Sequence, residues 1–388
     1  MRIAIVHDWL TGMRGGERCL EVFCELFPEA DLFTLLHVKG SVSPKIEAMK
    51  IRTSFVQNLP FSRKGYRSYL PLFPLAVESF DLKGYDLVLS SSHCVAKGVI
   101  PPPDCCHISY VYSPMRYVWD MYFDYFGNPR GRRAGRPVLA LFAHYLRAWD
   151  VTSSERVDHF IAISRHVARR IKKYYRRDSK IIHPPVDTRR FRVSKGSDDF
   201  YLIVSALAPY KGIDLAVQAF NRLGYPLKLI GSGQDEKRLR AMARPNIEFL
   251  GWQPDDVVAE HYSRCKALVF PGEEDFGITP LEAQASGRPV IAYGRGGVLE
   301  TVVPLSDRQI EGRDVEAREG PDRPGSLATG VFFYEQSVES LIRAVRVFEE
   351  KADLFHGKAL RRHAMKWDRS VFKRNFRDAV SDILRSWS

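Results

Sequence analysis

Residues 266–303 read KALVFPGEEDFGITPLEAQASGRPVIAYGRGGVLETVV, and the order of their apolar, acidic and glycine residues decides the fold. The run Ala267–Phe270 is apolar throughout, which is typical of a strand buried in a parallel sheet. Acidic residues follow where this strand ends, and Pro280 then fits the first turn of a helix that continues over Leu281–Ala285. Thr279 is therefore the expected N-cap. The pattern predicts a strand, a turn and a helix, with acids at the carboxyl edge of the sheet.

The same turn has the composition of a binding site for a sugar nucleotide. A glycine-containing turn before a helix leaves backbone N–H groups unpaired at the positive end of the helix dipole, where a phosphate can bind. Glu274 lies before the turn and Glu282 lies eight positions later, so their carboxylates can accept hydrogen bonds from sugar hydroxyls. A solvated acidic loop is the alternative for such an acid pair. The flanking Pro271–Gly272 and Gly296–Gly297 favour the binding site.

The segment EEDFGITPLE, residues 273–282, resembles the E-x7-E signature of the retaining glycosyltransferases of family 4, which have the two-domain GT-B fold. The PG before it and the ASGRPVIAYGRGGVLETV after it follow the order of that family. The resemblance extends along nearly the whole chain, and it looks closest to the bacterial mannosyltransferase-like branch that builds O-antigen and exopolysaccharide repeat units. It implies that Glu274 contacts the donor sugar and Glu282 the ribose hydroxyls. It also implies that sugar and diphosphate lie on the backbone N–H groups of Phe276, Gly277, Ile278 and Thr279.

The length of 388 residues and the hydrophobic content of 45% fit two domains that each have their own core. Strand and helix patterns alternate in both halves, which predicts an α/β protein with a doubly wound parallel sheet in each half. The resemblance implies two Rossmann-like sheets that face each other across a cleft, with C-terminal helices that cross back to the first domain. The expected boundaries are 1–187 for an acceptor-binding domain, 188–199 for a linker, 200–365 for a nucleotide-sugar-binding domain, and 366–388 for a helical tail.

The first half carries candidate residues after two predicted strands. Gly15 and Gly16 allow a ligand to approach the start of a predicted helix, residues 17–26, and the resemblance places this loop near the diphosphate or the acceptor. The segment YDLVLS, residues 85–90, is a predicted central strand that leads to His93. The resemblance implies that His93 contacts the transferred sugar and helps to position the acceptor. A histidine that is satisfied by neighbouring backbone is the alternative.

The segment YSPMRYVWD, residues 112–120, resembles a family segment in which a histidine is expected where Tyr112 stands. No second histidine is therefore assigned. Tyr112, Arg116 and Asp120 are the candidates on the acceptor side.

In the second half, ALAPYKG at residues 206–212 forms a predicted strand-to-helix turn with a lysine, which is a natural partner for a pyrophosphate. Relatives carry an arginine and a lysine five residues apart in this turn; Lys211 matches the lysine, and Ala206 stands in place of the arginine. Either another basic residue such as Arg295 supplies the missing charge, or the leaving group is stabilised less. The next glycine turn adds Gly231 and Gly233 as donor-binding candidates.

The resemblance implies that the chain moves a hexose from a nucleoside-diphosphate sugar to a hydroxyl group with retention at the anomeric carbon. Lys211 would stabilise the departing diphosphate, Glu274 would orient the sugar, and His93 would assist the acceptor. No cofactor or metal is expected, because the strand ends carry no D-x-D pair near a histidine and the family needs none. GDP-mannose is the expected donor, and UDP-glucose or another UDP-hexose is the alternative. A non-redox sugar-nucleotide epimerase and a non-catalytic scaffold are the competing functions.

Basic residues exceed acidic ones by 58 to 46, and the first half holds three basic clusters at residues 63–69, 130–136 and 169–177. Such clusters can attract nucleic acid, anionic lipid or an anionic substrate, and no nucleic-acid-binding motif accompanies them. The first cluster is interleaved with aromatic and apolar residues, which indicates contact with a membrane surface. The alternative is a solvated charged face.

The expected location is the cytoplasm, with peripheral attachment to the inner face of the membrane. The six cysteines form no C-x-x-C pair, the amino terminus lacks a signal peptide pattern, and no run of 18 apolar residues occurs. The resemblance implies a saccharide or a polyprenyl-diphosphate-linked saccharide as acceptor. The hydrophilic segment 305–328 is expected to be a surface insertion.

Overall fold

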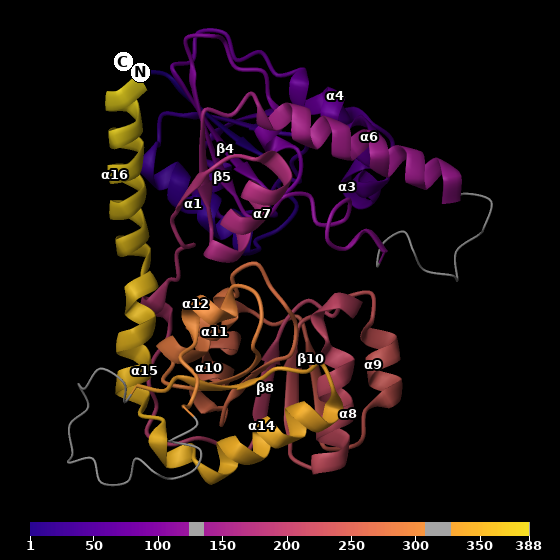
Figure 1. Ribbon diagram of the computed structural model, residues 1–388, viewed down its shortest axis with the longest axis vertical. Helices are drawn as coiled ribbons and strands as arrows, with labels where there is room; N and C mark the ends of the chain where they lie inside the picture. The colour runs from indigo at the N-terminus through magenta and orange to yellow at the C-terminus, as the bar shows by residue number, and fades with distance from the viewer. Residues whose placement is uncertain (124–135, 307–326, 388) are drawn as a thin grey trace. The chain divides into compact units, whose positions relative to one another are not determined.

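The computed structural model describes residues 1–123, 136–306 and 327–387 (Figure 1). Over these ranges the chain forms two compact units: residues 1–185 with 372–388, and residues 186–371. Most of the second basic cluster and of the expected surface insertion lies outside the described residues. No helix in the described part of the chain is long and apolar enough to cross a membrane.

The first unit is built on a parallel sheet whose strand order is β3-β2-β1-β4-β5-β6-β7. The central strands β4 and β5 are buried along their whole length, polar residues included, whereas the edge strands are largely exposed. The strands are β1 (Ile3–His7), β2 (Asp31–Thr34), β3 (Lys50–Thr53), β4 (Leu87–Ser92), β5 (Cys106–Val111), β6 (His159–Ala162) and β7 (Ser179–Ile181).

Helices connect these strands, and the last helix of the chain packs on the first. Phe372 and Phe376 of α16 (Arg369–Trp387) contact Phe23 of α1 (Gly15–Leu26), with ring centroids 5.8 and 4.7 Å apart. The C-terminal tail thus completes the core of the first unit. The other helices are α2 (Pro44–Glu47), α3 (Ser62–Gly65), α4 (Phe73–Glu78), α6 (Arg136–Ser154) and α7 (Arg165–Tyr175), with 3-10 turns η1 (Phe55–Asn58), η2 (Tyr66–Leu72) and η3 (Ala96–Gly98).

The second unit has a parallel sheet in the order β10-β9-β8-β11-β12-β13. Its strands are β8 (Tyr201–Val204), β9 (Leu227–Ile230), β10 (Ile247–Gly251), β11 (Leu268–Phe270), β12 (Val290–Tyr293) and β13 (Gly330–Phe333). Its helices are α8 (Ile213–Leu223), α9 (Glu236–Met242), α10 (Asp255–Arg264), α11 (Ile278–Ala285), α12 (Val298–Thr301), α14 (Val338–Glu350) and α15 (Gly357–Ala364). The 3-10 turns are η5 (Thr188–Arg190), η6 (Pro209–Lys211), η7 (Ala352–Leu354) and η8 (Met365–Trp367).

Both sheets are doubly wound, so the prediction of two Rossmann-like units is confirmed. In each sheet the strand order reverses once, between β1 and β4 in the first unit and between β8 and β11 in the second. Loops that leave the two strands at such a reversal diverge and expose the carboxyl edge, where open α/β sheets bind ligands. The loops after these four strands are therefore the first places to look for a site.

Candidate functional site

In the second unit, the loops after β8 and β11 bring two of the predicted catalytic residues together. The ammonium group of Lys211 forms an ion pair with the carboxylate of Glu274. Both side chains are mostly buried, with exposed fractions of 17% and 16%. The two loops also touch through their backbones, because a Cβ atom on Gly272 would lie 2.7 Å from the carbonyl oxygen of Lys211. Glycine at this position lets the lysine loop approach the acidic loop closely.

Gly296 and Gly297, in the loop after β12, also contact the acidic loop. The N–H group of Gly297 donates to the carbonyl oxygen of Glu274 over 2.8 Å. A Cβ atom on Gly296 would lie 2.3 Å from that oxygen, and one on Gly297 would lie 2.3 Å from the Cα atom of Phe276. These glycines therefore pack the loop after β12 against the acidic loop. Arg295, the suggested substitute for the missing arginine, is exposed beside them.

The prediction that Thr279 caps the following helix is wrong. Helix α11 begins at Ile278, its N-cap is Gly277, and Thr279 lies in the first turn. Gly277 has a φ of +84°, a left-handed conformation that glycine adopts without strain, so the turn closes two residues earlier than a threonine cap would allow. The first-turn N–H groups still lack acceptors within the helix, as in any α-helix, and they remain available to bind an anion.

The second predicted acid, Glu282, is held by a residue that the sequence analysis missed. Glu282 lies in the middle of α11 and is half-buried. The hydroxyl group of Tyr262, a fully buried residue of α10, donates a hydrogen bond to its Oε2 atom over 3.0 Å. Because the two residues are 20 positions apart on different helices, no local pattern marks the pair.

Gly231 and Gly233 shape the loop after β9. A Cβ atom on Gly231 would lie 1.9 Å from the carbonyl oxygen of Ser205, and one on Gly233 would lie 2.2 Å from that of Leu207. These glycines thus let the loop pack against the backbone segment that leads to Lys211. Their contact with a donor stays a prediction.

In the first unit, a buried carboxylate orients His93. Asp8 follows β1 and is fully buried. It pairs with Nδ1 of His93 at 2.9 Å and accepts hydrogen bonds from four consecutive backbone N–H groups over 2.7 to 3.1 Å. These N–H groups belong to His93, Cys94, Val95 and Ala96.

The charges of Asp8 and His93 stabilise each other. Burial alone would raise the pKa of Asp8, but His93 outweighs this effect and lowers it to about 2. Burial would lower the pKa of His93, but the Asp8 carboxylate raises it overall. An ionised carboxylate only accepts hydrogen bonds, so Nδ1 of His93 must carry the proton that it donates. The sequence analysis did not single out Asp8; its position after a central strand was the available signal.

Gly16 and Tyr112 belong to a polar network next to this pair. The hydroxyl group of Tyr112 donates to the carbonyl oxygen of Gly16 over 3.0 Å and lies 2.8 Å from Oγ of Ser91. Ser91 in turn contacts Nδ1 of His7 at 3.0 Å, and Nε2 of His7 lies 3.9 Å from Glu17. Burial raises the pKa of Tyr112 well above its usual value. Tyr112 thus ties α1 to the central strands, and its contact with an acceptor stays a prediction.

Gly15 and the other two acceptor-side candidates lie on different parts of the unit. Gly15 is the first residue of α1, two residues before the predicted start of that helix. Asp120 pairs with Arg170 and accepts a hydrogen bond from Tyr174, both on α7, so it anchors its loop to that helix. Arg116 lies half-buried in the same loop.

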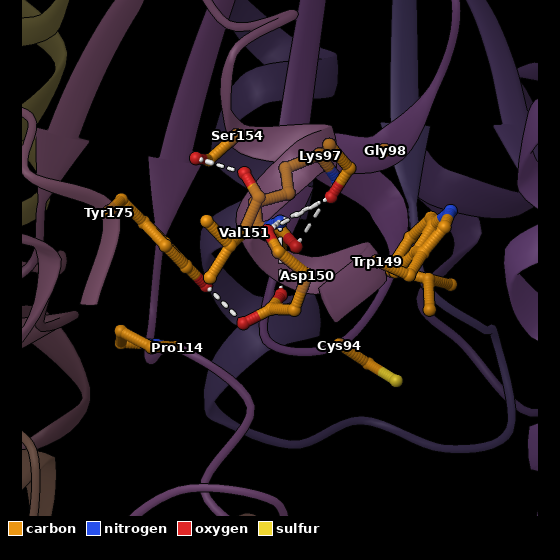
Figure 2. A network of polar contacts seen from close by, with 12 residues as sticks. Cys94, Lys97, Gly98, Pro114, Trp149, Asp150, Val151, Ser154 and Tyr175 are labelled. Carbon is orange, nitrogen blue, oxygen red and sulfur yellow. Dashed lines mark hydrogen bonds and ion pairs between the residues drawn. The ribbon is translucent and has the colours of Figure 1, made fainter. Parts of the chain in front are cut away.

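A buried lysine fixes the loop that carries His93. Figure 2 shows Lys97 among residues of α6 and α7, with its ammonium group 3.0 Å from Oδ1 of Asp150. This group also donates to the Asp150 carbonyl oxygen and to Oγ of Ser153, each over 2.7 Å. The other carboxylate oxygen of Asp150 accepts from Tyr175 over 2.9 Å. Burial lowers the pKa of Lys97, although Asp150 opposes this effect. The loop is therefore bound to Asp8 at one end and to Asp150 at the other.

Over residues 1–123, 136–306 and 327–387, no group of three or more His, Cys, Asp or Glu side chains is arranged to hold a metal ion. That the reaction needs no metal stays a prediction.

The second unit matches a known protein family. Residues 187–356 match the model of the family described as glycosyl transferases group 1. Over 231 residues the chain is 31% identical to the GDP-mannose-dependent monoacylated alpha-(1-6)-phosphatidylinositol monomannoside mannosyltransferase of Corynebacterium glutamicum. This alignment covers 49% of this chain and 60% of that protein. Over 102 residues it is 33% identical to the O-antigen chain mannosyltransferase C of Escherichia coli, which covers 24% of this chain and 28% of that protein. The chain thus spans 60% or less of the length of these relatives.

A solved structure matches the whole chain in fold. The complex of Anabaena HepE with UDP-glucose aligns with a TM-score of 0.69 and 14% identity over 98% of this chain and 100% of that one. At this identity the match concerns the fold alone, and it agrees with the two doubly wound sheets described above. The chain therefore has the GT-B fold, and residues 187–356 in its second unit match the glycosyl transferases group 1 model.

Proposed function

We propose that this chain is a retaining, metal-independent glycosyltransferase of family 4. In this proposal it transfers mannose from GDP-mannose to a saccharide or lipid-linked saccharide during synthesis of a cell-surface polysaccharide. The observation that carries the proposal is the Lys211–Glu274 pair at the strand reversal of a group 1 domain, with Glu282 on the helix that follows. The two mannosyltransferase relatives support mannose as the sugar. A UDP-hexose is the alternative donor.

The ion pair suggests how the second unit would bind a donor. A sugar nucleotide presents a diphosphate, which attracts Lys211, and sugar hydroxyl groups, which donate to Glu274. Donor binding would therefore exchange one ion pair for two separate contacts. As the bond between the anomeric carbon and the phosphate oxygen breaks, Lys211 and the first-turn N–H groups of α11 would stabilise the charge that develops on the leaving diphosphate.

His93, from the first unit, would contact the transferred sugar or the acceptor. Its Nδ1–H is directed to Asp8, which leaves Nε2 to contact an oxygen of the sugar or the acceptor. With its pKa raised, His93 would donate a hydrogen bond from Nε2 and hold that oxygen in place. The acceptor hydroxyl would attack from the face that the diphosphate leaves, and its proton would pass to the departing phosphate oxygen. No covalent nucleophile is assigned.

A panel of nucleotide sugars tests the donor. The melting temperature of the protein is measured with GDP-mannose, UDP-glucose and ADP-glucose, and GDP-mannose is expected to raise it, since a ligand that binds the folded state stabilises it. Glu282→Ala should abolish the shift. An unchanged shift in this variant would contradict the assignment of Glu282 to the ribose.

An assay with labelled donor tests the reaction itself. The expected product is an acceptor glycoside with the anomeric configuration of the donor, determined by NMR. Interconversion of donor isomers alone would indicate an epimerase, and binding without turnover in any acceptor screen would indicate a scaffold.

We also propose that the first unit attaches to an anionic membrane surface. Phe61 and Leu75 are 88% and 61% exposed, and the exposed Arg63 and Arg67 lie between them in the sequence. Exposed apolar side chains beside cationic ones favour the interface of an acidic bilayer. Co-sedimentation with vesicles that contain phosphatidylglycerol is the test. Phe61→Asp should weaken binding, whereas equal binding to neutral vesicles would contradict the proposal.

A further inference from the structure

The hydroxyl group of Tyr262 is held rigidly and points at a carboxylate. Tyr262 lies in the last turns of α10, and its side chain is completely buried. Its ring packs edge-on against Phe191, with centroids 5.8 Å apart and ring planes at 83°. Its hydroxyl group lies 3.0 Å from Oε2 of Glu282. Packing therefore fixes the position of the hydroxyl group from which Glu282 accepts a hydrogen bond.

The side chain of Glu282 is less confined by packing than that of Tyr262. It is half-buried, and a glutamate side chain that is not held samples several rotamers, whose loss opposes ligand binding. The hydrogen bond from Tyr262, whose own position is fixed by packing, restricts these rotamers before a ligand arrives. A carboxylate has room for about four hydrogen bonds, so the bond from Tyr262 leaves capacity to accept from a ligand.

We propose that Tyr262 is a positioning residue that directs the Glu282 carboxylate at the two hydroxyl groups of the donor ribose. The inference rests on the proposed function, in which Glu282 contacts the ribose. It adds a specificity: a carboxylate held in this way discriminates ribose from 2′-deoxyribose, because the deoxy sugar leaves an oriented acceptor without its partner. Tyr262 would thus contribute to selection of ribonucleotide donors without touching them.

The same unit provides a matched control for a purely structural role. Tyr201 is also buried, and its hydroxyl group donates to Glu349 of α14. It is the first residue of β8, so it lies at the amino end of the strand whose carboxyl end leads to Lys211. Tyr201→Phe and Tyr262→Phe each remove one hydroxyl group that bonds to a glutamate, and each keeps the packed ring.

The test compares GDP with 2′-deoxy-GDP, or UDP with 2′-deoxy-UDP if the uridine nucleotide is the one that binds. Dissociation constants are measured by calorimetry on the full chain. Wild type is expected to prefer the ribonucleotide by about tenfold, as the loss of a hydrogen bond to a charged group implies. Tyr262→Phe should weaken ribonucleotide binding by about fivefold to tenfold, weaken deoxynucleotide binding by a smaller factor because only the 3′-hydroxyl contact is affected, and so reduce the preference for ribose. Tyr201→Phe should retain it.

The outcomes separate this inference from the proposed function. No nucleotide binding by wild type, or no preference for ribose, would overturn the role of Glu282 and the inference with it. A clear preference in wild type that persists undiminished in Tyr262→Phe would overturn the inference alone. Incorporation of 4-aminophenylalanine at position 262 restores a donor to the ring and should restore the preference; failure to do so would also count against the positioning role.

Discussion

The two units place charged side chains at equivalent points of their sheets but hold them in different ways. In the first unit Asp8 accepts five hydrogen bonds from one loop, and Lys97 fixes the end of that loop. In the second unit the side chains of Lys211 and Glu274 form an ion pair with each other. A carboxylate that accepts from four backbone N–H groups cannot change partners without unfolding its loop, whereas an ion pair between two side chains can be separated by a ligand. The first unit thus carries a fixed site and the second an exchangeable one.

The largest expected effect comes from removing the two carboxylates in turn. Asp8→Ala leaves four N–H groups and an imidazolium without their acceptor, so we expect the free energy of unfolding of the first unit to fall by about 3–5 kcal/mol. Glu274→Ala should lower that of the second unit by less, because it removes one ion pair between side chains rather than the acceptor of five hydrogen bonds. Native-state hydrogen exchange in residues 87–98 and 268–285 measures both changes. Equal losses would erase the distinction between a fixed and an exchangeable site.

The next effect concerns catalysis by the exchangeable pair. Lys211→Ala should lower kcat by about 10²–10³-fold, as removal of one group that stabilises developing charge does in other enzymes. Steady-state assays of Lys211→Ala, Glu274→Ala and the double variant measure how far the two effects overlap. Because the residues touch, we expect the double variant to lose less than the sum of the single losses. Strict additivity would show that the lysine and the acid act independently.

A smaller effect is expected from a change in pH, which alters the charge of His93 in the fixed site and thereby the stability of the first unit. The Asp8 carboxylate raises the pKa of His93, Glu17 adds to this effect, and Arg14 opposes it. A raised pKa means that the stability contributed by His93 is complete below its unfolded pKa and is lost as pH rises through the folded value. Stability should therefore fall as pH rises above about 6.5, and activity with it if the charged ring donates. The difference in melting temperature between wild type and His93→Gln should shrink between pH 6 and 9; a constant difference would contradict this.

The stability contributed by Asp8 depends on pH in the opposite direction. Its pKa is lowered from 3.8 to about 2, so its contribution is complete above the ordinary value and is lost as pH falls toward 2. A urea titration of wild type against Asp8→Asn between pH 5 and 2 should show the two converging. Divergence at low pH would contradict the charge pair.

The smallest expected effect is that of a chelator, since in the proposed mechanism Lys211 and the α11 amides take the role of a cation. Incubation with EDTA should leave kcat unchanged, and added Mg²⁺ should not raise it. A loss with EDTA that Mg²⁺ restores would show that the second unit requires a metal ion.

The sequence was most informative where a feature is local. The strand and helix around the acidic turn could be predicted, because an apolar run, a Pro-Gly pair and a helix-compatible proline follow one another directly. The cap was misplaced because the conformation of Gly277 decides it, and a φ angle is not visible in a residue type that is common in turns. The expectation of a site at the carboxyl edge needed only the order of strands and helices.

The partners of the site residues could not be predicted. Asp8 bonds to backbone groups 85 to 88 positions away, and backbone groups leave no mark in the sequence. Tyr262 meets Glu282 only because α10 packs beside α11, and Lys97 meets Asp150 through the packing of α6. Such pairs depend on the tertiary structure, which an alternation of strands and helices does not specify.

The ion pair between Lys211 and Glu274 has a consequence for turnover. A spent nucleoside diphosphate can still attract the lysine, but it has lost the hexose whose hydroxyl groups would bind Glu274 in exchange. Re-formation of the pair would then favour departure of the by-product, while an intact sugar nucleotide can replace both halves of the pair at once. A protein built in this way would be inhibited only weakly by the nucleotide that it releases.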